Sequence, residues 1–116
     1  MDTKFKQSFI RDMAYQNQRD SQGTRVLWSR HAAIELVADN LTRYQVERAL
    51  QRAEVIEDYP HLHRPLPDCL VLGWVSSGEP IHAVVAVDIE LDRILIVTVY
   101  RPSKEEWQDD WRTRAK

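Results

Sequence analysis

Apolar and polar residues follow their clearest pattern between residues 80 and 101. Two runs dense in Val and Ile, at residues 81–87 and 94–100, flank a short polar segment that is suited to reversing the chain. This pattern predicts a β-hairpin. Because both faces of each run are apolar, we expect the hairpin to lie in the middle of a sheet that is covered on both sides.

Three polar residues interrupt the hairpin: His82, Thr98 and Tyr100. Side chains alternate between the two faces of a strand, so an odd number of turn residues puts His82 opposite Tyr100, and an even number puts them on opposite faces. We expect the odd number. It groups the polar side chains, whereas the even number leaves each of them unpaired among aliphatic residues, at a cost of roughly 1 to 3 kcal/mol.

Helical spacing marks the first part of the chain, where four apolar residues recur: Phe5, Phe9, Ile10 and Met13. They predict a helix over about residues 3–17. Its apolar face is larger than a free helix leaves in water. We therefore expect this amino-terminal arm, residues 1–24, to pack on the following domain, residues 25–116, or on a second subunit.

Two further helices follow in close succession. Ser29 is a good N-cap for a helix over residues 30–40, and Thr42 with Gln45 forms a capping box for a helix over residues 43–52. The tight connection predicts a helical hairpin whose apolar faces pack on a sheet. The first of these helices has four apolar residues that we expect to face the core: Ala33, Ile34, Val37 and Leu41.

The remaining pattern completes an α+β domain. Residues 54–59 and 68–75 predict two strands, which join the hairpin to give a four-stranded antiparallel meander after the amino-terminal helices. Ser103 and Glu106 suggest a capping box for a carboxy-terminal helix that ends at about residue 113. Trp107 and Trp111 would share one face of that helix and pack against the sheet.

Composition and charge narrow the class of protein. The 116 residues carry a net charge of −2, but residues 1–53 hold 9 Lys and Arg against 6 Asp and Glu, whereas residues 54–116 hold 7 against 12. Lack of a long apolar run and of a signal segment predicts a cytoplasmic protein without membrane contact. The single cysteine, Cys69, agrees with a reducing compartment.

Few side chains are suited to chemistry. His31 lies in the first turn of its predicted helix, where the helix dipole favours a neutral imidazole, and His82 lies within an apolar strand. Zinc ligation by His61 and His63 with Asp68 or Cys69 matches no common closed site, so we expect no metal and no cofactor. With only three glycines, the chain has no phosphate-binding loop and no dinucleotide-binding motif.

Several stretches together resemble a bacterial family of small domains of unknown function that is grouped with RelE-like and BrnT-like toxin ribonucleases. They are LWSRHAAIELV, VERAL, VIEDYP, DCLVLGW, PIHAVVA and IVTVYRPS, and they span most of the chain, from about Val26 to Arg112. The resemblance implies a RelE-like α+β fold. It also implies a site lined by four residues: His31, His82, Thr98 and Tyr100.

The activity implied by this resemblance is metal-independent cleavage of RNA by the neighbouring 2′-hydroxyl. Such a reaction needs a base for that hydroxyl, an acid for the leaving oxygen and a positive charge beside the phosphorane. His31 would be the base, His82 the acid, and Tyr100 would orient them. The candidate cations for RNA phosphate are Arg30, Arg43 and Arg101.

One departure from the family pattern supports a second interpretation. The family often has an arginine four positions after the helix histidine, where this chain has Glu35. With the acidic carboxy-terminal half, this substitution favours a catalytically inactive protein-binding or dimerising module. The expected partners are accordingly an RNA substrate, a cognate antitoxin protein or a second copy of the chain.

Overall fold

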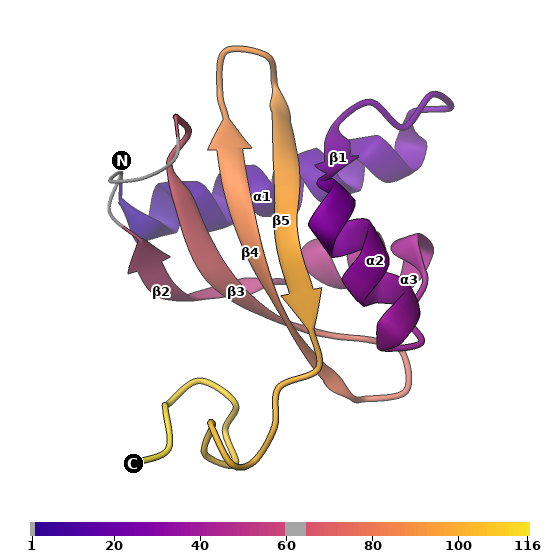
Figure 1. The fold of residues 1–116 in the computed structure, drawn as a ribbon. Helices are drawn as coiled ribbons and strands as arrows, with labels where there is room; N and C mark the ends of the chain where they lie inside the picture. The colour runs from indigo at the N-terminus through magenta and orange to yellow at the C-terminus, as the bar shows by residue number, and fades with distance from the viewer. Residues whose placement is uncertain (1, 60–64) are drawn as a thin grey trace.

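The computed structural model describes residues 2–59 and 65–116. Figure 1 shows their arrangement. In chain order, the described helices and strands are α1 (Thr3–Arg19), β1 (Val26–Trp28), α2 (Arg30–Ala38), α3 (Arg43–Leu50), β2 (Glu54–Tyr59), β3 (Asp68–Trp74), β4 (Pro80–Asp88) and β5 (Arg93–Tyr100).

The strands form one mixed sheet in the order β1-β5-β4-β3-β2. β1 runs parallel to β5, and the other neighbours are antiparallel. The α+β class is therefore correct, but the four-stranded antiparallel meander is wrong. The additional strand, β1, is only three residues long, and its partner β5 lies almost seventy positions further along the chain. Local periodicity therefore could not reveal the pairing.

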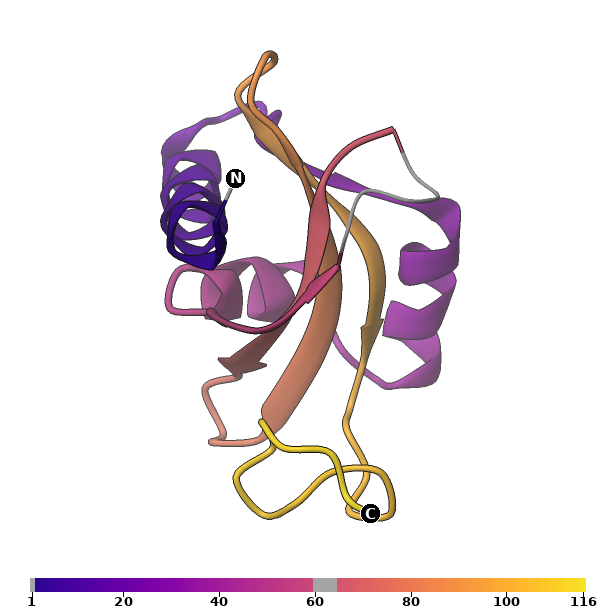
Figure 2. The same cartoon turned by 90° about the vertical axis from the view of Figure 1, so that its left-hand side faces the viewer.

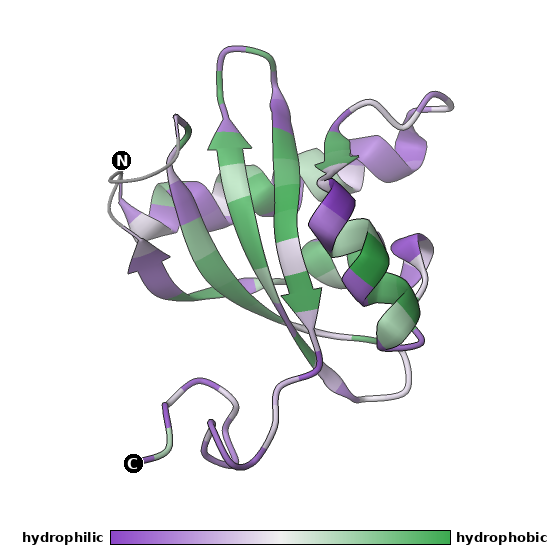
Figure 3. Ribbon diagram, in the orientation of Figure 1, coloured by the Kyte–Doolittle hydropathy of each residue, from purple (hydrophilic) through white to green (hydrophobic). Residues whose placement is uncertain are grey.

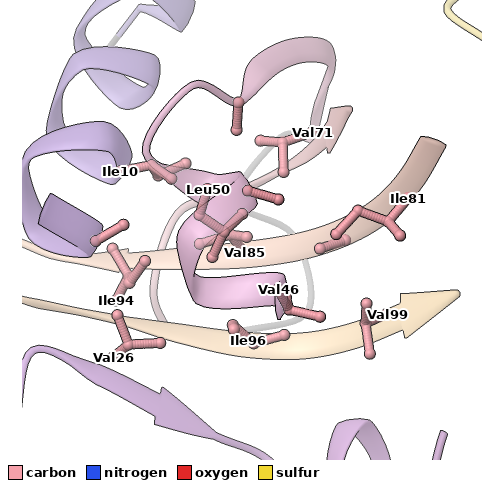
Figure 4. Packing of buried hydrophobic residues seen from close by; sticks show 14 of the residues in the cluster. Ile10, Val26, Val46, Leu50, Val71, Ile81, Val85, Ile94, Ile96 and Val99 are labelled. Carbon is pink, nitrogen blue, oxygen red and sulfur yellow. The ribbon is translucent and has the colours of Figure 1, made fainter. Parts of the chain in front are cut away.

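Helices cover both faces of the sheet. Figure 2 shows α1 and α3 on one side and α2 on the other, so the expected helical hairpin on one face is wrong. The main core lies between the sheet and the α1–α3 layer, where Ile10 of α1 and Leu50 of α3 meet Val85 of β4 (Figure 4). The central strands are apolar along their length because each of their faces packs on a layer (Figure 3).

The amino-terminal helix forms as expected and packs on the domain. Asp2 caps α1 by accepting a hydrogen bond from the Phe5 amide at 2.7 Å, and Met13 belongs to the main core. Lys6 is buried on this helix and forms an ion pair with Asp58 of β2. No helix in the described part of the chain combines the length and apolar character needed to cross a membrane.

The orientation of α2 differs from the expected one. Ile34 and Val37 are 61% and 79% exposed, whereas Ala32 and Leu36 face the core. The expected apolar face is therefore wrong for Ile34 and Val37, whereas Leu41 is buried in the core as expected. Figure 3 shows the apolar residues of α2 as green segments.

Hydrogen bonds to the edge of β5 explain this orientation. Beyond β1, the edge of β5 has no neighbouring strand, and a strand edge needs partners for its backbone groups. Side chains of α2 and its caps supply them. The Ser29 hydroxyl donates to the Val97 carbonyl at 2.8 Å, the Val99 amide donates to Glu35 at 3.1 Å, and the Arg101 amide donates to Asp39 at 3.2 Å.

The register of the hairpin combines an even turn with a β-bulge. Asp88 pairs with Arg93, so the turn contains four residues, and the expected odd count is wrong. Val84 pairs with Thr98 while Val85 pairs with Ile96, which leaves Val97 as an extra residue in β5. The bulge changes the parity. His82 therefore lies opposite Tyr100 after all, and the expected polar pairing is present.

The carboxy-terminal segment, residues 101–116, is not helical, so the expected terminal helix is wrong. Trp111 has a positive φ of 61°, which a right-handed helix excludes. The Asp110 carboxylate also accepts from the Arg112 and Thr113 amides at 2.9 and 3.0 Å, a local bonding pattern that competes with helix formation. A bridge between Trp107 and Arg114 closes the resulting turn.

Candidate functional site

The polar residues of the hairpin form what we call the His82 cluster, which consists of His82, Tyr100, Trp107 and Trp111. His82 is completely buried, and both of its ring nitrogens have partners. Nε2 lies 2.8 Å from the Trp111 carbonyl oxygen, and Nδ1 lies 3.2 Å from the Tyr100 hydroxyl. A carbonyl can only accept, so Nε2 carries the proton and Nδ1 accepts from Tyr100 in the neutral ring.

Aromatic and charged side chains close this cluster from solvent. The indole of Trp107 is 2% exposed and meets the His82 ring edge-on, with centroids 4.4 Å apart. The Arg114 guanidinium lies 4.8 Å from the centre of the Trp107 ring. It also binds both oxygens of Glu57, at 2.7 and 2.9 Å. The carboxy-terminal segment is thus bound to β2 and covers His82.

Burial sets the protonation states within the cluster. It lowers the pKa of His82 and raises the pKa of Tyr100, so both groups are held neutral. Arg114 partly opposes the shift at Tyr100, whereas the carboxylates of Glu106, Glu57 and Glu35 add to it.

The other two predicted site residues meet through Glu35. His31 is 70% exposed, and its Nε2 lies 3.3 Å from Glu35 Oε1. The same carboxylate oxygen accepts from the Thr98 hydroxyl. In the described residues, these contacts place His31 and Thr98 at Glu35, and His82 with Tyr100, as two neighbouring groups along β5. The sequence did not indicate that Glu35 links the first group, because its role depends on the exposed edge of β5.

The three predicted phosphate-binding arginines are not gathered at either group. Arg101 binds Glu79 at 2.9 Å and the Asp39 carbonyl at 3.0 Å. The Arg43 guanidinium lies over the Trp28 ring, 5.7 Å from its centre, and Arg30 is exposed in the first turn of α2. The geometry therefore joins His31 with Thr98 through Glu35, and His82 with Tyr100. Among the described residues, no hydrogen bond or ion pair joins the two histidines or gathers the arginines around them.

Metal and thiol chemistry receive no support from the described residues. They contain no group of three His, Cys, Asp or Glu side chains that could hold a metal ion. His61 and His63, considered above as zinc ligands, lie outside the described residues. Cys69 is fully buried, and burial raises the pKa of its thiol to about 12, so it is an unreactive core residue.

Two sizeable cavities lie on the α1–α3 side of the sheet. One of about 740 Å³ extends along α1, and one of about 660 Å³ lies between α3 and the end of β3. They share Gln51 and Arg52, and we refer to them together as the α1–α3 groove. The first includes Phe5, Arg11 and Tyr15.

A stripe of residues on α3 forms one wall of this groove. Tyr44 and Arg48 are four positions apart and share the exposed side of α3. Arg52 follows the end of α3 at Leu50, is exposed and lines the same cavity. The Arg48 guanidinium donates to the Tyr44 hydroxyl at 3.1 Å. Trp74, at the end of β3, is 45% exposed and completes the wall. The four-residue spacing of Tyr44 and Arg48 is visible in the sequence, but the prediction for this helix considered only its apolar face.

Comparison with protein-family models finds a match over residues 28–101 to a domain of unknown function, DUF4258. The match runs from the last residue of β1 through β5 to Arg101, so α1 and residues 102–116 lie outside it. No curated protein and no solved structure matches the chain. None of these comparisons links the chain to RelE-like or BrnT-like toxins.

Proposed function

We propose that this chain, which belongs to the DUF4258 family of domains of unknown function, acts as a protein-binding module through its α1–α3 groove. The observation that carries this proposal is the exposure of large aromatic side chains along the groove. Tyr44 is 59% exposed and Trp74 is 45% exposed, and Phe5 and Tyr15 are exposed at the other end. Exposed Tyr and Trp beside Arg is the composition typical of binding hot spots.

The closed state of the His82 cluster also supports binding rather than catalysis. A general acid must reach the substrate atom that it protonates, to within about 3 Å or through one water. His82 is completely buried, and both of its nitrogens are already hydrogen-bonded. Its hydrogen bonds and its aromatic neighbour account for this histidine as a satisfied structural residue.

Glu35 gives a further reason to favour binding. The resemblance to toxin ribonucleases implies an arginine at this position, whereas Glu35 accepts hydrogen bonds from the Val99 amide and the Thr98 hydroxyl. An arginine has no acceptor and could not form these bonds. In this chain the position therefore serves the edge of the sheet, and its charge repels phosphate.

Selection of peptides from a random display library tests the proposal. We expect the immobilised protein to enrich peptides, and we expect the double variant Tyr44→Ser, Trp74→Ser to lose this enrichment. The matched control is Ile34→Ser, Val37→Ser, which changes two exposed apolar residues on α2 across the sheet. Enrichment that depends on α2 and not on the groove, or no enrichment by the wild-type protein, would contradict the proposal.

A toxin-type ribonuclease of the RelE or BrnT kind is the second candidate, and one observation favours it. His31 is exposed, and Glu35, which lies 3.3 Å away, is held by Thr98 and can orient the ring as a base. In such a toxin the groove would suit a cognate antitoxin.

Cleavage of single-stranded RNA separates the two candidates. A ribonuclease should give 2′,3′-cyclic phosphate ends, and His31→Ala should slow cleavage by about 10² to 10⁴, while Ile34→Ala should not. The protein-binding proposal predicts that the wild-type protein and both variants give the same background.

A further inference from the structure

We infer that the α1–α3 groove takes an acidic peptide segment, one that carries apolar side chains among two or three carboxylates. This inference rests on the proposed function and names the chemistry of the partner. Its basis is the charge of the groove, which differs from that of the whole chain.

Positive charge is concentrated in the groove although the protein has a net charge of −2. The cavity between α3 and β3 is lined by Arg48 and Arg52 and by no acidic residue. The cavity along α1 adds Arg11 and has one acidic residue, Asp12, whose carboxylate accepts from Gln16 at 3.0 Å. The surface therefore presents three guanidinium groups against a single carboxylate.

These arginines are available to a ligand. In the described residues, Arg52 has no ion-pair partner, and Arg48 donates only to the hydroxyl of Tyr44. Arg11 uses Nε for the Ala53 carbonyl, at 2.8 Å, which fixes its stem and leaves its terminal nitrogens without a carboxylate partner in the part of the chain that the structure describes. Exposed guanidinium groups favour bidentate binding of Asp or Glu carboxylates.

The number of arginines favours an acidic peptide over a single-stranded nucleic acid, which also stacks on aromatic residues. A protein that binds nucleic acid through its phosphates typically makes roughly six to ten phosphate contacts. On a single strand, each contact contributes about 0.7 to the slope of log binding constant against log salt concentration. Three arginines would supply only about a third to a half of that number of contacts. They match two or three carboxylates directly, while Tyr44 and Trp74 supply the apolar contact.

A charge-reversal selection tests this inference. The random-peptide library is selected in parallel on the wild-type protein, on Arg48→Glu, Arg52→Glu, and on the control Arg30→Glu, which reverses an exposed arginine of α2. We expect the wild-type and control pools to be enriched in Asp and Glu next to aromatic residues. The groove variant should enrich Lys and Arg instead, and it should bind the best acidic peptide at least about tenfold more weakly.

The outcomes separate this inference from the proposed function. Peptides that need Tyr44 and Trp74 but show no acidic preference would overturn the inference and leave the protein-binding function standing. Loss of all groove-dependent enrichment would overturn both. Displacement of the acidic peptide by a lower concentration of oligouridylate than of free peptide would assign the groove to nucleic acid and would also overturn the inference.

Discussion

The His82 cluster and the α1–α3 groove use the same residue types in opposite ways. In the cluster, Trp107 is buried, and the arginine above it, Arg114, is bound by Glu57 through two hydrogen bonds. In the groove, Trp74 is half exposed, and Arg52 has no acidic neighbour in the cavities it lines other than Asp12. Residue type alone therefore does not distinguish a binding surface from a folded interior.

Pairing and burial make the distinction between these two regions. Every buried side-chain nitrogen and oxygen of the described residues has a hydrogen-bond partner, so the buried ring nitrogens of His82 are already occupied. The groove retains uncovered aromatic rings and unpaired cations, which cost the free protein little in water but gain contacts on binding.

Trp107 in the His82 cluster and Trp74 in the groove should differ most in their contribution to stability. Trp107→Ala should lower the free energy of unfolding by about 3 to 5 kcal/mol, because it removes a buried indole and its contact with His82. Trp74→Ala should cost less than about 1 kcal/mol because its ring is partly in water. Denaturant unfolding of both variants measures the difference. Equal losses would show that the two regions do not differ as described.

Acidification should reduce the stability that the His82 cluster contributes, by less than the loss of Trp107 does. Burial lowers the pKa of His82 below its ordinary 6.5, so below that pH the unfolded chain takes up a proton that the folded chain refuses. Stability contributed by the neutral ring is present above about pH 6.5 and falls by at most about 1.4 kcal/mol per pH unit below it. The difference in unfolding free energy between the wild type and His82→Gln should therefore shrink from pH 7 to pH 5. A difference that does not change with pH would contradict the lowered pKa of His82 in the folded protein.

The ion pair that holds the carboxy-terminal segment should contribute still less. Glu57→Gln should cost about 0.2 to 1 kcal/mol, because the Arg114 side chain is largely exposed and water screens the pair. The same change at Glu105, an exposed residue of the same segment, serves as the control. Thermal unfolding at low and high salt should show a loss for Glu57→Gln that shrinks with salt. A loss that does not respond to salt would point to packing instead.

The groove arginines should have the smallest effect on folding. Arg48→Glu, Arg52→Glu should change the free energy of unfolding by no more than about 0.5 kcal/mol, because neither residue forms an ion pair among the described residues. Calorimetry of the double variant checks this. Marked destabilisation would mean that the arginines serve the fold, and a loss of peptide binding could then no longer be assigned to charge.

Local signals in the sequence were sufficient for most of the elements. The caps at Ser29 and Thr42 and the runs of Val and Ile correctly located two helices and the central strands. Interactions between distant segments were not accessible in this way. The pairing of β1 with β5 joins residues far apart in sequence, and the non-helical end depends on hydrogen bonds made by Asp110.

The candidate site shows the same division. The pairing of His82 with Tyr100 was expected, but it arises from a bulge at Val97 combined with an even turn, and a bulge has no distinct signal in a run of Val and Ile. The burial of His82 under the Trp111 carbonyl was not foreseeable, because it depends on how the carboxy-terminal segment folds back. The catalytic roles assigned to His31 and His82 remain predictions.

The indole N–H signals of the four tryptophans test the central claim most directly, since one spectrum reports on both regions at once. An acidic peptide from the selection is titrated into the isotope-labelled protein, and the four signals are followed by NMR. Binding in the groove predicts that the Trp74 signal moves in proportion to saturation while the Trp107 signal stays in place. Movement of the Trp107 and Trp111 signals, with Trp74 unchanged, would show that the ligand opens the His82 cluster, and it would contradict the account.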